Sequence, residues 1–125
     1  MDLLRERGLI WSRASRVPRR IGPDELRLAT EPDAAGAADV VLATVKTAAT
    51  AEAGRQLAPH LRPGAVMVSF QNGLRDTETL REQLTGRLVL AGMVPYNVVQ
   101  TEPGTVHQGM PGTLMVERVR SAVGD

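Results

Sequence analysis

Cysteine is absent from this 125-residue sequence, and aromatic residues are nearly absent. Without cysteine the chain has neither disulfides nor thiolate metal sites, which is compatible with a cytoplasmic location. Trp11, Phe70 and Tyr96 are the whole aromatic set, too few for a surface that stacks nucleic-acid bases. The two histidines, His60 and His107, lie far apart in the sequence, so no histidine-based metal site is predicted.

Excess charge and long apolar runs are also missing. The formal net charge is +1, which gives no electrostatic reason to expect nucleic acid or an anionic membrane as a partner. No apolar run reaches the length of a transmembrane helix, and the first residues lack a signal-peptide layout. With 42% hydrophobic and 23% charged residues, the chain has the composition of a soluble globular protein. A single domain spanning residues 1–125 is predicted, in the cytoplasm.

Three apolar runs rich in β-branched residues stand in the middle of the sequence, at residues 39–45, 65–70 and 88–94. Such continuous runs are typical of strands that are buried on both faces in a parallel sheet. The intervening segments have helical periodicity. Thr47 is expected to cap the first helix, which would run to about Leu61.

The second helix is expected to be capped by Asp76, with Leu80 and Leu84 one turn apart on its apolar side. The alternation of strands and helices predicts right-handed crossovers and a parallel sheet. The predicted fold class is α/β, a partial Rossmann-like parallel sheet.

The outer segments are less regular. A short helix is expected to end at Arg7, with Gly8 as its cap and a strand from Leu9. Residues 16–26 indicate a loop and residues 26–31 a short strand, and a helical turn is expected to start at Pro32. The last third, broken by Pro-Gly pairs, predicts a small antiparallel C-terminal extension.

Two loops follow predicted parallel strands, and each carries a polar side chain. Lys46, the single lysine beside fourteen arginines, follows the first strand, and Asn72 follows the second. Ligands bind beyond the carboxyl ends of the strands in open α/β sheets. Lys46 could meet a phosphate or ribose oxygen, Asn72 offers an amide donor and acceptor, and Gly73 would let a ligand approach the backbone.

The same residues also fit a purely structural role. A lysine at a strand end is usually solvated, and Asn-Gly usually forms a turn. The Gly-rich G-x-G-x-x-G signature of dinucleotide folds is absent from the sequence, so residue pattern alone does not establish a nucleotide site.

Four stretches together resemble the ketopantoate reductases (2-dehydropantoate 2-reductases). They are ADVVLATVKTAAT at residues 38–50, VMVSFQNGL at 66–74, VLAGMVPYNVV at 89–99 and EPGTVHQGMPGTLMV at 102–116. No single motif is strong, but their order and spacing are fairly specific. The resemblance spans about residues 4–117 and covers the later part of the family's nucleotide-binding domain.

The resemblance implies NADPH-dependent reduction of ketopantoate, a small 2-oxo acid, to pantoate in pantothenate biosynthesis. It makes Lys46, Asn72 and, less securely, Val98 cofactor contacts, with Asn72 also near the substrate, and gives His107 a role in the sheet or a turn. The first strand, the Gly-rich phosphate loop and the helical domain with the catalytic lysine would lie outside this chain. We therefore expect no catalytic residue and no metal site in it, and no turnover by this chain alone.

Two other functions remain open at this point. One is a relic nucleotide fold that acts in binding or assembly, because a sheet without its first strand exposes an edge that favours self-association. The other is an NAD(P)-dependent oxidoreductase acting on a different 2-oxo or 2-hydroxy acid. The sequence does not separate NADP from NAD.

Overall fold

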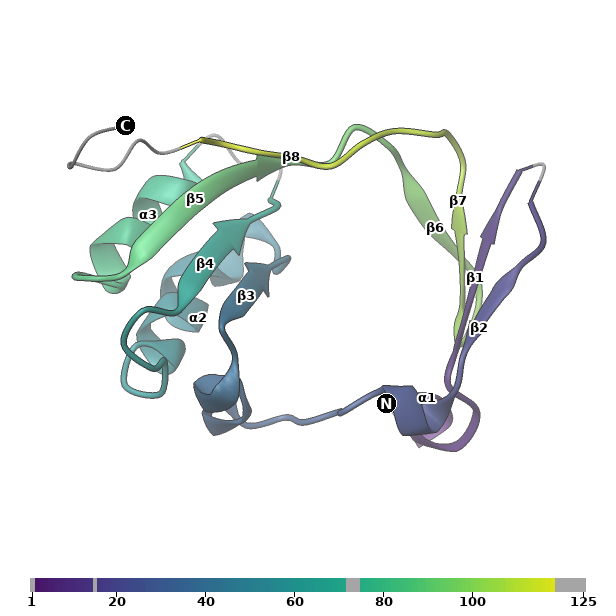
Figure 1. The fold of residues 1–125 in the computed structure, drawn as a ribbon, viewed down its shortest axis with the longest axis horizontal. Coiled ribbons are helices and arrows are strands. Elements are labelled where there is room, and N and C mark those ends of the chain that lie inside the picture. The colour runs from purple at the N-terminus through teal and green to yellow at the C-terminus, as the bar shows by residue number, and fades with distance from the viewer. Residues whose placement is uncertain (1, 15, 72–74, 119–125) are drawn as a thin grey trace. The chain divides into compact units, whose positions relative to one another are not determined.

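The computed structural model of the protein describes residues 2–14, 16–71 and 75–118. The chain forms two compact units (Figure 1). Unit 1 comprises residues 1–30 and 94–113, and unit 2 comprises residues 31–93 and 114–125. Among the described helices, none has the length and apolar character that crossing a membrane requires.

Unit 2 is built around three parallel strands. They are β3 (Val40–Ala43), β4 (Val66–Ser69) and β5 (Leu88–Met93), hydrogen-bonded in that order. The 3-10 helix η3 (Thr47–Ala49) and α2 (Thr50–Leu57) connect β3 to β4, and α3 (Asp76–Gln83) connects β4 to β5. Both connections step in the same direction along the sheet, so right-handed crossovers place both helices on one face, as Figure 1 shows. The predicted parallel α/β arrangement is confirmed.

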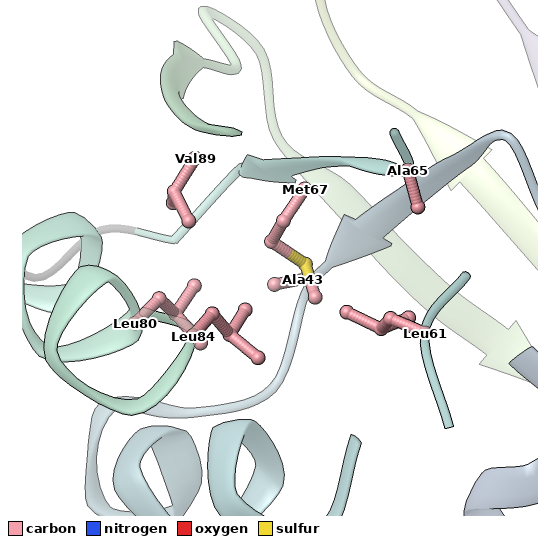
Figure 2. Packing of buried hydrophobic residues seen from close by; sticks show 7 residues of the cluster. All are labelled: Ala43, Leu61, Ala65, Met67, Leu80, Leu84 and Val89. Atoms are coloured by element: carbon pink, nitrogen blue, oxygen red, sulfur yellow. The ribbon is translucent and has the colours of Figure 1, made fainter. Parts of the chain in front are cut away.

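The core of unit 2 lies between the helices and the facing side of this sheet (Figure 2). Met67 of β4 and Leu80 of α3 are almost completely buried, and Leu84 lies beside Leu80, as its spacing predicts. Gly54 lets α2 pack closely on α3, because a Cβ atom there would lie 2.8 Å from the Cβ of Gln83. The whole cluster consists of Ala43, Leu61, Ala65, Met67, Leu80, Leu84 and Val89.

The opposite side of the parallel sheet is exposed on its two outer strands, contrary to the prediction of strands buried on both faces, whereas on the central strand β4 Val68 is only 5% exposed. Val40 and Leu42 of β3 are each 55% exposed, and Leu88 of β5 is 45% exposed. Successive strand residues point to opposite faces, and no described part of unit 2 covers these three side chains. In addition, β3 forms one edge of the sheet.

The predicted helix caps are wrong. The α-helix α2 begins at Thr50 rather than after Thr47, and Asp76 is the first residue of α3 rather than the residue before it. The Thr47 hydroxyl donates to the Asp76 carboxylate over 3.0 Å, so these two side chains are joined by a hydrogen bond. The helix α2 also ends earlier than predicted, at Leu57, because Pro59 has no N–H to continue it.

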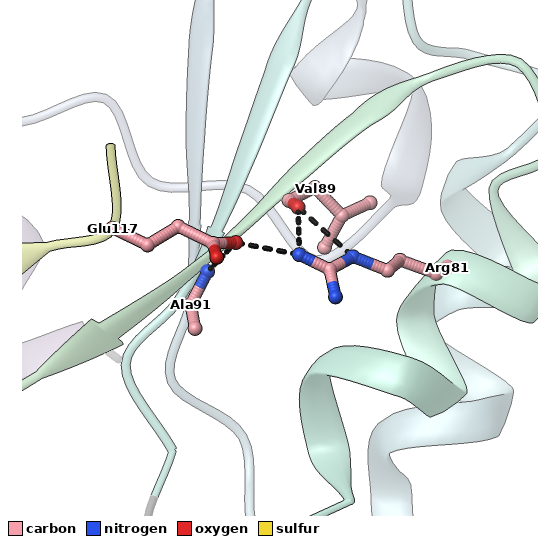
Figure 3. A network of polar contacts seen from close by, with 4 residues as sticks. All are labelled: Arg81, Val89, Ala91 and Glu117. Carbon is pink, nitrogen blue, oxygen red and sulfur yellow. Dashed lines mark hydrogen bonds and ion pairs between the residues drawn. The ribbon is translucent and has the colours of Figure 1, made fainter. Parts of the chain in front are cut away.

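A short strand and an ion pair hold the C-terminal segment to unit 2 (Figure 3). The strand β8 (Met115–Val116) pairs antiparallel with β5. The carboxylate of Glu117 then accepts hydrogen bonds from Arg81 of α3, over 2.5 Å, and from the Ala91 N–H, over 2.8 Å. Arg81 also donates to the carbonyl oxygen of Val89, so a single guanidinium joins α3, β5 and the segment after β8.

Unit 1 contains a mixed four-stranded sheet in the order β2-β1-β7-β6. Two antiparallel pairs, β1–β2 and β6–β7, are joined by parallel pairing of β1 with β7. At this junction the Ser12 hydroxyl lies 2.8 Å from Nδ1 of His107, so His107 serves the sheet. The strands are β1 (Leu9–Arg13), β2 (Arg19–Ile21), β6 (Val98–Glu102) and β7 (Thr105–Gln108).

The N-terminal predictions are confirmed in part. The helix α1 (Asp2–Arg7) ends at Gly8, whose φ of +77° and close approach to the carbonyl oxygen of Ile21 both require glycine. The helical turn η2 (Pro32–Ala37) starts where predicted. The expected loop at 16–26 instead contains β2, because that segment pairs with β1, and the expected strand at 26–31 is absent.

Candidate cofactor-binding site

The carboxyl ends of β3 and β4 border a hollow in unit 2. Its volume is about 320 Å³, and it is lined by Thr44, Val45, Lys46, Thr47, Phe70 and Gln71. The parallel pairing of Ala43 with Ser69 aligns the two strand ends, and the Phe70 N–H continues the pairing by donating to the Ala43 carbonyl oxygen. The two loops that follow the predicted parallel strands therefore lie together, as far as their residues are described.

Lys46 supplies the only charge among the residues that line this hollow. Its backbone is extended, with φ −69° and ψ 153°, and the side chain is exposed. Among the described residues, the Lys46 side chain has no hydrogen-bond or ion-pair partner, and the Lys46 carbonyl oxygen accepts from the Ala49 N–H. The Lys46 ammonium group therefore keeps its three donors for solvent or a ligand.

Gln71 fastens the β4 loop to the β3 loop. Its side-chain amide donates to the carbonyl oxygen of Val45 over 2.8 Å and to the hydroxyl of Thr50 over 2.7 Å. Its side-chain oxygen accepts from the Ser69 hydroxyl over 2.9 Å. Both amide hydrogens are thus used inside the protein, and Gln71 shapes the hollow instead of donating to a ligand.

A buried carboxylate, that of Asp76, continues the hydrogen bonds of Gln71. Asp76 is 2% exposed and accepts hydrogen bonds from Thr47, over 3.0 Å, and from Thr50, over 3.2 Å. Thr50 accepts from Gln71 with the same hydroxyl oxygen, so the chain of bonds runs from Gln71 through Thr50 to Asp76. This network fixes the start of α2, and with it the loop that presents Lys46.

The aromatic wall of the hollow depends on a glycine in β5. A Cβ atom at Gly92 would lie 2.5 Å from two atoms of the Phe70 ring, closer than packing permits. Gly92 therefore leaves the room that the Phe70 ring occupies beyond the end of β4.

The other predicted contacts are distributed differently. Asn72 lies outside the described residues. Val98 is the first residue of β6 in unit 1, where it is exposed and pairs with Gln108. The preceding carbonyl, that of Asn97, accepts a hydrogen bond from the Gly109 N–H. The described structure thus places Lys46 at the hollow and Val98 in the other unit.

Sequence reasoning missed Gln71, Thr50 and the true role of Asp76. A signal existed for two of them, because Thr47 and Thr50 lie one helical turn apart and a carboxylate opens the next helix. Such residues look like caps in the sequence, since capping and cross-helix bonds use the same side chains. The partner of each is decided by the tertiary packing.

The sequence matches the model of one protein family. The family model described as ketopantoate reductase PanE/ApbA matches residues 3–121. The 2-dehydropantoate 2-reductase of Halobacterium salinarum is 35% identical over 95 residues, which are 76% of this chain and 31% of that protein. The chain thus spans about a third of the length of this relative.

Solved structures agree with the family match. A PanE/ApbA family ketopantoate reductase from Ralstonia eutropha superposes with a TM-score of 0.83 at 28% identity, covering 94% of this chain and 38% of that one. The 2-dehydropantoate 2-reductase of Geobacter metallireducens superposes with a TM-score of 0.75 at 23% identity. The match covers 89% of this chain and 36% of the Geobacter chain. The second similarity establishes the fold alone.

Proposed function

The chain belongs to the ketopantoate reductase family, and we propose that it supplies part of the NADPH site of a 2-dehydropantoate 2-reductase. The reaction proposed for the whole enzyme is reduction of the ketone of ketopantoate, a 2-oxo acid, to the alcohol of pantoate. The observation that carries this proposal is the exposed Lys46 ammonium in the hollow where β3 and β4 end. Crevices at strand ends are where α/β folds bind dinucleotides.

The residues of the hollow suit a dinucleotide. A phosphate or ribose oxygen of NADPH would accept from the Lys46 ammonium, which has no competing carboxylate among the lining residues. Gln71 and the Thr50–Asp76 pair would keep the Lys46 loop in place before the cofactor arrives. When bound, NADPH supplies the hydride.

Two further contacts belong to the proposal on the strength of the family resemblance. Asn72 would contact both cofactor and substrate, and the backbone at Val98 would contact the cofactor. Preference for NADPH over NADH is part of the same proposal.

This chain is proposed to bind NADPH without catalysing the reduction of ketopantoate by itself. Protonation of the alkoxide that forms on hydride transfer needs a donor near the reacting carbon. The family uses a lysine, and the sequence holds one lysine, Lys46, which matches the cofactor position. Measurable NADPH-dependent reduction of ketopantoate by the purified chain would contradict this part of the proposal.

Calorimetric titration with NADPH tests the binding site. We expect Lys46→Ala and Asn72→Ala each to weaken binding by about tenfold, the loss expected for one hydrogen bond to a charged group. Arg55→Ala on α2 is the matched control, because it removes one exposed cation that does not line the hollow. Parallel titration with NADH tests the choice of cofactor. Unchanged affinity in both variants, or no binding by a folded chain, would refute the site.

The open edge of the parallel sheet supports self-association as a second part of the proposal. The edge strand β3 exposes Val40 and Leu42, and unpaired apolar edges favour pairing with another chain. Light scattering of the wild type and of Leu42→Lys tests this. We expect the wild type to form oligomers and Leu42→Lys to be monomeric. A monomeric wild type would refute the proposal.

A further inference from the structure

We propose that unit 1 carries a second anion site, which binds the diphosphate group of a small molecule on the hairpin formed by β1 and β2. A hollow of about 620 Å³ lies there, within the size range of small-molecule sites. It is lined by Trp11, Arg13, Arg16, Val17 and Arg19, and none of these residues is acidic. The site belongs to unit 1 and shares no residue with the hollow around Lys46 in unit 2.

Strand geometry brings the arginines together. Trp11 pairs with Arg19 across the hairpin, so their side chains share one face of the sheet. Arg13 follows Trp11 by two positions and returns to the same face. The Arg13 guanidinium lies over the Trp11 ring, 4.4 Å from its centre, and this contact holds the guanidinium in place.

Positive charge at the hairpin is not balanced within its own stretch of sequence. Residues 10–22 contain four arginines, Arg13, Arg16, Arg19 and Arg20, and no acidic residue. Among the described residues, Arg13, Arg16 and Arg19 form no ion pair with a carboxylate. Gathering like charges is unfavourable unless an anion compensates them. Arg20 lies on the other face and donates to the Arg7 carbonyl oxygen.

The chemistry of these side chains selects a phosphorylated ligand. Guanidinium groups bind phosphate oxygens through paired hydrogen bonds, and several of them match a diphosphate better than a single carboxylate. Arg13 and Arg16 also border a neighbouring hollow along residues 108–113, where Met110 and Pro111 offer apolar surface. An organic group attached to the diphosphate would lie there.

Titration with inorganic pyrophosphate at constant ionic strength tests the site. Trp11 is the single tryptophan, so its fluorescence reports binding beneath Arg13. We expect a saturable change, with Arg13→Gln and Arg19→Gln each weakening binding by about tenfold. Because Arg13→Gln alters the reporter itself, calorimetry with pyrophosphate provides the second measurement.

Two control variants distinguish this site from general charge attraction and from binding at Lys46. Arg20→Gln removes the same charge from the opposite face of the hairpin and should leave affinity within about twofold. Lys46→Ala should leave the Trp11 fluorescence titration unchanged, and an effect there would assign the observed binding to the hollow in unit 2. Equal losses in Arg20→Gln, or no saturable change in a chain shown to be folded by circular dichroism, would overturn the proposal.

Discussion

The two units of this chain differ in what stabilises each of them. Unit 2 has a cluster of buried apolar side chains between its sheet and its two helices. In the described part of unit 1, only Gly8 and Gln108 are buried, and the strands carry mostly half-buried or exposed residues. Removal of apolar surface from water is the main stabilising term in folding, so unit 2 should have the larger share of the stability. Unit 1 depends chiefly on the pairing of its strands.

The largest expected effect is that of truncating a leucine in the unit 2 core. Leu80→Ala removes a fully buried side chain and should lower the free energy of unfolding by about 3 kcal/mol. Leu9→Ala makes the same change on the half-buried β1 and should cost about 1 kcal/mol. Urea unfolding followed by far-ultraviolet circular dichroism and by Trp11 fluorescence measures both. Equal costs would contradict the contrast between the units.

A smaller loss is expected where glycine makes room for an aromatic ring. Gly92→Ala brings a methyl group against Phe70 and should cost about 2 kcal/mol through overpacking. Gly22→Ala in unit 1 is the matched control, because nothing lies within 4 Å of a Cβ atom there. Adding Phe70→Leu to Gly92→Ala should recover part of the loss. Equal Tm shifts in the two glycine variants would argue against a clash with the ring.

The ion pair that secures the C-terminal segment should matter less. Glu117→Gln removes the charge that faces Arg81, whose side chain is 46% exposed, and should cost about 1 kcal/mol or less. Salt should reduce the difference from wild type. Thermal melts at low and high ionic strength measure this difference. The control is Glu82→Gln, which removes a carboxylate next to Arg81 on α3.

The smallest effect is expected at Glu52 on α2. A hydrogen bond from Gln56, and after it the hydrogen bond and charge of Arg55, lower the pKa of Glu52 below 4.5. A carboxylate with a lowered pKa in the folded state stabilises it above the unfolded pKa, and this contribution is lost as the pH falls through the folded value. Because Glu52 is fully exposed, the effect is small. The Tm of Glu52→Gln should be slightly lower than that of the wild type at neutral pH and should equal it in acid.

The sequence predicted unit 2 well because local periodicity and burial agree there. The runs that became β3, β4 and β5 pair with near neighbours in the chain, and Leu80 and Leu84 are buried as their spacing indicated. The open face of the sheet was not predicted, because an apolar run shows what a strand can bury and not what covers it.

The sequence predicted unit 1 and the polar side chains of the site less well. Arg19–Ile21 has no strong strand signal and becomes β2 by pairing with β1. The parallel pairing of β1 with β7 joins residues that no local pattern connects. At the hollow, Lys46 was found by its place at a strand end. Gln71 was passed over because its partners, Val45 and Thr50, are set by the approach of two loops.

The parallel pair formed by β1 and β7 has a consequence for the order of folding. Ser12 meets His107 across 95 positions of the chain, whereas β3, β4 and β5 each meet a strand one helix away. Distant pairings form slowly, because a long loop must close before they gain any energy. During synthesis, β1 must therefore wait for β7 to emerge before the two strands can pair, while the parallel sheet can assemble as its strands emerge. The sheet of unit 1, whose strands β1 and β2 precede unit 2 in the sequence, would be completed after the sheet of unit 2.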